Sequence, residues 1–303
     1  MLSLSPEKWQ AARREHRQRV APWVEDRVAR SLRGEKHPVY DFLFEYYTFR
    51  PAHLHRYSPG INVVLEDVQP AKTDWPRYFI EVEKGAVIRE ESFPAHRLLM
   101  LRWGRRFLET TLARQPVFHC FGLHEWAMVY RAGEVRHQQF PLRLTSDELA
   151  RFVESEHLCC THFDAFRFFT AEAAPRNRLQ LDRYSVMQHD QPGCIHANMD
   201  LYKWAYQFTP FIPSQLVADA FELARIAREI DMRASPYDLS ALGFEPIAIE
   251  TRVGREVYVE EQRRLYAASQ PLREQLLLAY SKLESLVAAQ PAICGGFSNG
   301  TSS

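Results

Sequence analysis

The stretch "PSQLVADAFELARIAREIDM", residues 213–232, decides the class of fold. Its apolar side chains recur at the spacing of one helical face, at Leu216, Val217, Ala220, Phe221, Ala224, Ala227 and Ile230. The pattern predicts a long amphipathic helix from Pro213 to about Met232. At the end of this stretch, Asp231, Arg233 and Asp238 are expected to form a structural ion-pair network.

Helical patterns also occupy the start of the chain. Ser5 and Pro6 are typical of a helix N-cap and first turn, and the helix that they begin should reach Leu32. A break is expected near Pro22, because proline lacks the N–H that a helix interior requires. A very aromatic helix is expected to begin at Pro38.

Four further helices are predicted from periodicity and capping residues. One covers residues 94–114, and another follows Gly122 in an apolar segment that could also be a strand. Ser146, with acidic residues behind it, predicts the N-cap of a third. The last, over residues 254–289, is expected to be interrupted at Pro271.

Residues 61–90 differ from the rest of the chain in composition. The runs "INVVLEDV" and "YFIEVEKGAVIRE" carry β-branched and aromatic residues around Gly85, which indicates a small pair of strands. The fold class predicted is therefore mainly α, with one large helical domain over residues 1–290 and a minor β element. The Gly- and Ser-rich end, residues 291–303, is expected to be a flexible tail.

Charge and composition limit the classes of partner. The 38 basic residues balance the 38 acidic ones, so any binding of damaged DNA must use a local basic patch, such as Arg102, Arg105 and Arg106. We find neither a signal-peptide core nor the run of about 20 apolar residues that spans a membrane, and we expect a cytoplasmic protein without a membrane partner. Five cysteines in so long a chain do not suggest a disulfide framework, so reduced thiols are expected.

Side chains able to do chemistry are concentrated in three segments, "FHCFGLHEWAMVYR" (118–131), "EHLCCTHFDAFRFF" (156–169) and "GCIHANMDLYKWAY" (193–206). They carry His119, His124, Glu125, His157, His162, Asp164, His196, Asn198 and Asp200. Their apolar surroundings indicate burial, and a buried polar group left without a partner costs about 1–3 kcal/mol. We therefore expect the three segments to converge on one polar site.

The spacing within these segments is compatible with a metal site. In a strand His162 and Asp164 would share a face, and in a helix His196 and Asp200 would lie one turn apart. A metal-dependent enzyme acting on a small molecule would use His124, His162 and His196, with Glu125, Asp164 and Asp200, to bind iron, manganese or zinc. A histidine bonded to a neighbouring carboxylate would also satisfy both groups without any function, and a third alternative is a non-catalytic protein that binds a small ligand.

Five strings suggest a family. "HPVYDFLFEYYTFRPAHLHRYSPG", "FGLHEWAMVYR", "THFDAFRFF", "GCIHANMDLYKWAY" and "ELARIAREIDMRASPYDL" resemble a group of bacterial proteins commonly labelled 3-methyladenine DNA glycosylase. The resemblance runs from about His37 to Leu239. It implies a hydrolase of DNA repair that cleaves the N-glycosidic bond of an alkylated purine, stacks the flipped base on aromatic rings and needs no cofactor.

This resemblance also implies roles for particular side chains. Asp164, Asp200 or Glu125 would be the catalytic acid that stabilises positive charge on the sugar or orients water. The substrate-binding residues would be Trp126, Phe166, Asn198, Tyr202 and Trp204. Both Pro-Gly steps of the chain, at Pro59 and Pro192, lack the second glycine of a helix-hairpin-helix turn, so no residue is assigned from that motif.

Overall fold

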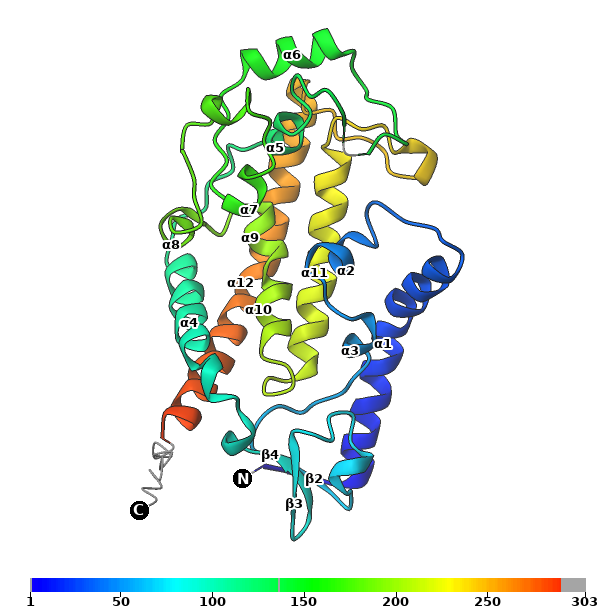
Figure 1. Cartoon of the computed structure of the whole chain (residues 1–303), viewed down its shortest axis with the longest axis vertical. Helices are drawn as coiled ribbons and strands as arrows, with labels where there is room; N and C mark the ends of the chain where they lie inside the picture. The colour runs from blue at the N-terminus through cyan, green and yellow to red at the C-terminus, as the bar shows by residue number, and fades with distance from the viewer. Residues whose placement is uncertain (1, 136, 290–303) are drawn as a thin grey trace, which may run out of the picture.

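Two long helices, α11 (Ser214–Arg233) and α12 (Arg252–Ala288), lie side by side at the centre of the molecule (Figure 1). The computed structural model describes residues 2–135 and 137–289. Every residue predicted on the apolar face of α11 is buried, from Leu216 to Ile230. The prediction of a mainly α fold with a minor β element is confirmed.

Shorter and longer helices surround this central pair. Helices α9 (Ile195–Met199) and α10 (Leu201–Gln207) pack on both α11 and α12, and α4 (Leu98–Leu112) packs on α12. The contact between α4 and α12 is close at Gly104, where a Cβ atom would lie 2.7 Å from the ring of Tyr280. Helix α1 (Pro6–Leu32) covers the other side of α11 (Figure 1).

The breaks predicted at two prolines are wrong. Helix α1 continues through Pro22 and α12 continues through Pro271. The residues around each proline are buried, with Val20 and Val24 flanking the first and Leu272 following the second. Packing of the adjacent turns stabilises a helix more than its intrinsic propensity does. Each helix therefore continues through its proline, although the proline cannot donate a backbone hydrogen bond.

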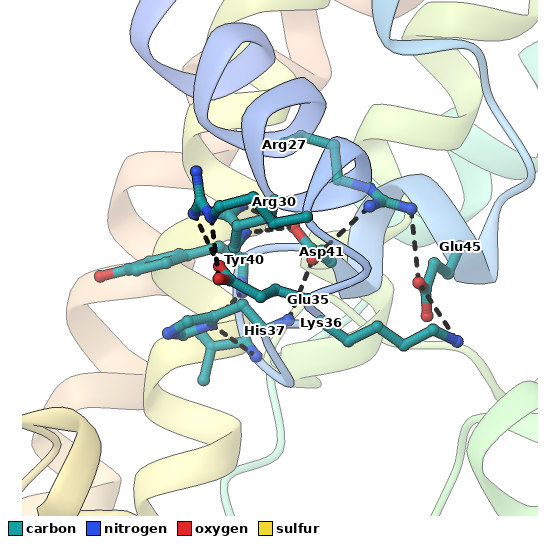
Figure 2. A network of polar contacts seen from close by, with 10 residues as sticks. Arg27, Arg30, Glu35, Lys36, His37, Tyr40, Asp41 and Glu45 are labelled. Carbon is teal, nitrogen blue, oxygen red and sulfur yellow. Dashed lines mark hydrogen bonds and ion pairs between the residues drawn. The ribbon is translucent and has the colours of Figure 1, made fainter.

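The aromatic helix predicted from Pro38 is also largely wrong. Only α2 (Phe42–Tyr46) forms there, followed by α3 (Pro51–Leu54). Figure 2 shows the reason: the buried carboxylate of Asp41 accepts hydrogen bonds from the guanidinium of Arg30, at 2.6 and 3.0 Å, and from the backbone N–H of His37 at 3.0 Å. These side-chain contacts hold residues 37–41 as a turn against the end of α1.

A small sheet closes one end of the molecule (Figure 1). Its strands are β1 (Leu2–Leu4), β2 (Val63–Glu66), β3 (Phe79–Val82) and β4 (Gly85–Ile88), in the order β1-β2-β4-β3. The predicted strands of residues 61–90 are confirmed, and the parallel pairing of β1 with β2 is an addition to them. Gly85 has a φ of 150°, and a Cβ atom there would lie 2.0 Å from the carbonyl oxygen of Leu65.

The loops between the long helices contain short helices. Helix α5 (Leu123–Ala127) begins directly after Gly122, as predicted, and Gly122 has the left-handed φ of 74°. The N-cap of helix α6 (Ser146–Ser155) is Thr145, one residue before the predicted cap Ser146, because Thr145 and Glu148 form a reciprocal capping box. The remaining short elements are α7 (Phe163–Phe166), α8 (Val186–His189), η1 (Pro70–Lys72), η2 (Glu90–Ser92), η3 (Ala95–Arg97), η4 (Ala174–Arg176) and η5 (Ser240–Leu242).

Two further expectations concern the whole chain. Cys120, Cys159, Cys160 and Cys194 are free thiols, while Cys294 and the expected tail over residues 291–303 lie outside the described residues. No helix within residues 2–135 and 137–289 combines the length and the apolar character that crossing a membrane requires.

Candidate functional site

Three of the five histidines in the predicted segments form a row in the interior, whereas His119 and His157 are exposed, contrary to the expected burial. His124 comes from α5, His196 from α9, and His162 immediately precedes α7. The ring of His196 is stacked on that of His162, with centroids 5.5 Å apart, and meets His124 edge-on at 4.5 Å. The three segments therefore do converge, although they are far apart in the chain.

A buried carboxylate orients the first histidine of the row. Nδ1 of His162 lies 3.1 Å from Oδ2 and 3.2 Å from Oδ1 of Asp190, so the Nδ1–H donates to this carboxylate. Nε2 of the same ring lies 3.9 Å from Oδ2 of Asp200. Asp190 was not predicted as a site residue. It precedes the turn at Pro192, and nothing in its position along the chain relates it to His162.

Asp200 is held from two sides. The hydroxyl of Tyr47 donates to its Oδ1 at 2.6 Å, and the ammonium of Lys203 lies 2.5 Å from its Oδ2. The same ammonium lies 3.8 Å from Oδ2 of Asp164, whose Oδ1 is 3.1 Å from Nε of Arg167. A cation from the protein itself therefore lies between the two predicted catalytic acids.

The other end of the row has its own charge network. Nε2 of His124 donates to Oδ1 of Asp231 at 2.7 Å, and Nη1 of Arg228 donates to Oδ2 of Asp231 at 2.6 Å. Arg228 also reaches Glu125 at 3.3 Å, so Glu125 pairs with an arginine and not with the histidine beside it in the chain. Asp231 does form an ion pair, but its partner is Arg228 and not the expected Arg233.

The remaining residues of that expected network lie elsewhere. The guanidinium of Arg233 donates through Nε to the carbonyl oxygen of Glu245, at 2.9 Å. Asp238 accepts from the backbone N–H and the hydroxyl of Ser240. The structural network predicted for the end of α11 therefore contains only Asp231 of the three residues.

Burial and neighbouring charges shift the pKa values of the row in opposite directions. Burial, and secondarily the adjacent His124, lowers the pKa of His196 to about 3, so this ring is neutral at pH 7. Burial also disfavours the charged form of His162, but the Asp190 carboxylate outweighs it and raises the pKa of His162 to about 8. Burial would raise the pKa of Asp200, yet Lys203 and His162 outweigh it and lower that pKa. At neutral pH the site thus holds a protonated imidazole beside an ionised carboxylate.

A cavity of about 440 Å³ opens on the His162 end of the row. Its polar side is formed by His162, Asp164, Asp190, Asp200, Lys203, Arg167 and Arg183. Its apolar side includes Trp103, Phe107 and Trp204, whose rings lie 5.0–5.5 Å apart. A volume of this size is within the usual range for small-molecule sites, and the aromatic side suits a planar ligand.

Four of the residues predicted to bind substrate lie outside this lining. Trp126 is fully buried and donates to the carbonyl oxygen of Ala234 at 2.9 Å, and Tyr202 is fully buried in the aromatic core. Asn198 accepts from the buried guanidinium of Arg273, and Phe166 packs on the ring of Phe169. Only Trp204 of the predicted set lines the cavity.

The spacing alternatives are also resolved by the structure. His162 and Asp164 do not lie on a strand, because α7 begins between them. His196 and Asp200 are one helical turn apart, but they face different partners, Asp231 and Lys203. The residues predicted to share one metal site therefore fall into two separate clusters. One is His124-His196-Asp231 and the other is His162-Asp164-Asp200.

The proposed basic stripe is partly neutralised within the chain. Arg102 and Arg105 both pair with Glu284, at 3.3 and 2.6 Å, and Arg105 also pairs with Glu109.

Comparison with protein-family models, curated proteins and solved structures finds no match to this chain.

Proposed function

We propose that this chain hydrolyses the N-glycosidic bond of an alkylated purine in the cavity beside Trp204. The observation that carries the proposal is the buried pair His162-Asp190, which faces the cavity with Nε2 of His162 only 3.9 Å from Asp200. A protonated imidazole can donate a proton to the departing base, and an ionised carboxylate beside it can stabilise the positive charge on the sugar. The resemblance to bacterial 3-methyladenine DNA glycosylases supplies the substrate class.

The aromatic side of the cavity would bind the base. The ring of Trp103 is stacked on that of Phe107, with 7° between their planes, and its side chain is 41% exposed at the cavity. The ring of Trp204 lies 5.5 Å from it. Stacking of an electron-poor purine on such rings is worth about 1–3 kcal/mol per base. The sugar would then lie towards His162 and Asp200.

Bond cleavage in this arrangement leaves the bonding electron pair on the purine and positive charge on the sugar. The Nε2–H of His162 can donate to a ring nitrogen of the departing base, while Asp190 stabilises the imidazolium. Asp200, which Lys203 and Tyr47 keep ionised, can stabilise the positive sugar. Water then attacks the sugar carbon, and Asp164, the more exposed carboxylate, is placed to accept its proton.

The test is release of free base from methylated DNA, measured by chromatography. We expect His162→Gln to reduce the rate about 10²- to 10⁴-fold, the range for a general acid, and Asp200→Asn to reduce it as well. The matched controls are His96→Gln and Asp26→Asn, two exposed side chains away from the cavity, which should keep the rate of the unmodified protein. Absence of base release from double-stranded, single-stranded and nucleoside substrates would refute the proposal.

A further inference from the structure

The proposed reaction leaves the second cluster, His124-His196-Asp231, without a role. Its side chains come from three different helices, α5, α9 and α11, and one ligand atom from each lies within 4.8 Å of the others. His124 and Asp231 are buried, and the side chain of His196 is 14% exposed. Two imidazoles and one carboxylate are ligands that zinc and ferrous iron use in proteins.

His196 is the ring of this cluster that is free to bind something else. Its ring nitrogens make no hydrogen bond with any residue in 2–135 or 137–289, and the nearest carboxylate oxygen, Oδ2 of Asp231, is 3.9 Å from Nε2. The ring is nevertheless fixed in place, because it lies edge-on to His124 and stacked on His162. An ordered imidazole with an unused lone pair is what a metal ligand requires.

The other two ligands are oriented by partners outside the cluster. Oδ2 of Asp231 accepts from Arg228, whose guanidinium also contacts Glu125 and lies 3.9 Å above the ring of Phe42. Oδ1 of Asp231 shares a hydrogen bond with Nε2 of His124, at 2.7 Å. An ion can replace the shared hydrogen there while Arg228 keeps its contact with the second oxygen. Such outer partners hold metal ligands in position.

The cluster His162-Asp164-Asp200 is a weaker candidate for the same ion. The ammonium of Lys203 lies 2.5 Å from Asp200 and 3.8 Å from Asp164, so it already neutralises these carboxylates. An ion could bind there only after displacing that lysine. In the other cluster Arg228 also pairs with a carboxylate, but it contacts Oδ2 of Asp231, at 2.6 Å, while Oδ1 faces Nε2 of His124 at 2.7 Å.

We propose that His124, His196 and Asp231 bind one divalent ion of the zinc type. The three protein ligands leave the remaining coordination positions open to water or a substrate group, as in catalytic zinc sites. Because the ring of His196 is stacked on that of His162, with centroids 5.5 Å apart, the ion would lie near the His162-Asp190 pair. This proposal does not depend on the glycosidic reaction, because binding of an ion is measured without any substrate.

The experiment is a Co²⁺ titration of the chelator-treated full chain, followed by visible absorption, with elemental analysis for zinc of the protein as purified. We expect one equivalent of Co²⁺ with the absorption of a site containing nitrogen ligands. His196→Phe keeps an aromatic ring between its neighbours but removes the lone pairs, and Asp231→Asn keeps the shape of the carboxylate. Each variant should bind Co²⁺ at least about 100-fold more weakly, since even outer-partner changes cost 10- to 100-fold.

The matched control is His162→Phe, the same substitution on the adjacent ring of the other cluster, which should retain the ion. Two results overturn the proposal: no Co²⁺ binding by the unmodified chain, or binding that survives His196→Phe and Asp231→Asn. Loss of Co²⁺ in His162→Phe with retention in His196→Phe would place the ion in the other cluster and also overturn it. Circular dichroism of each variant separates loss of a ligand from loss of fold.

Discussion

The hydrogen bond between His162 and Asp190 contributes to the pH dependence of stability, and Asp190→Asn should remove that contribution. The folded-state pKa of His162 is about 8, above the ordinary value of 6.5. Because the folded pKa is the higher one, the stabilisation is fully present below pH 6.5 and is lost as the pH rises through 8. A difference of about 1.5 pH units corresponds to about 2 kcal/mol in total, of which about 1 kcal/mol is lost between pH 7 and 8.5.

The assay is urea unfolding at pH 7.0, 7.5, 8.0 and 8.5, with a chelator present. The buried thiols and the histidines whose pKa values are lowered also titrate in the unfolded chain, so the quantity compared is the difference in slope between the unmodified chain and Asp190→Asn. In Asp190→Asn the main group that opposes the burial of His162 is removed, and the variant should lose about 1 kcal/mol less stability than the unmodified chain between pH 7 and 8.5. The backbone carbonyl of residue 190 keeps its bond to Arg114 in this variant.

The control for this prediction is His162→Gln, which removes the titrating ring itself and should change the slope by the same amount as Asp190→Asn. The reasoning is refuted if Asp190→Asn keeps the slope of the unmodified chain between pH 7 and 8.5. NMR titration of the His162 ring gives an independent measurement of the same pKa.

Three further predictions concern packing and ligand binding. Tyr47→Phe removes a buried donor to Asp200 and should lower the free energy of unfolding by about 1–3 kcal/mol, measured in urea; an unchanged midpoint contradicts the contact. Gly104→Ala should cost about 1–3 kcal/mol because the new methyl meets a ring of α12, whereas Gly133→Ala, with open space around it, should not; equal thermal midpoints for the two would contradict this. Trp103→Ala should weaken binding of a methylated purine by about 1–3 kcal/mol with little change in fold, measured by calorimetry, and equal affinity would remove this ring from the base-binding side.

Part of the site was predictable from local composition. Histidines and carboxylates in aromatic segments indicated burial, and the three rings of His124, His162 and His196 do lie together. The partners that decide their chemistry were not predictable in the same way. Asp190 is 28 positions from His162, and Asp231 is 107 positions from His124, without any periodic relation between them.

By itself, the sequence determined where the long helices lie, which face of α11 is buried and where the strands of residues 61–90 lie. These features depend on contacts between residues three or four apart, or on alternation along a strand, and such spacing is written directly in the chain. Only the tertiary structure decided that helices continue through Pro22 and Pro271, and that Glu125 pairs with Arg228 while Asp231 bonds His124. The reason is that these outcomes depend on how separate helices pack, and packing energies exceed local preferences.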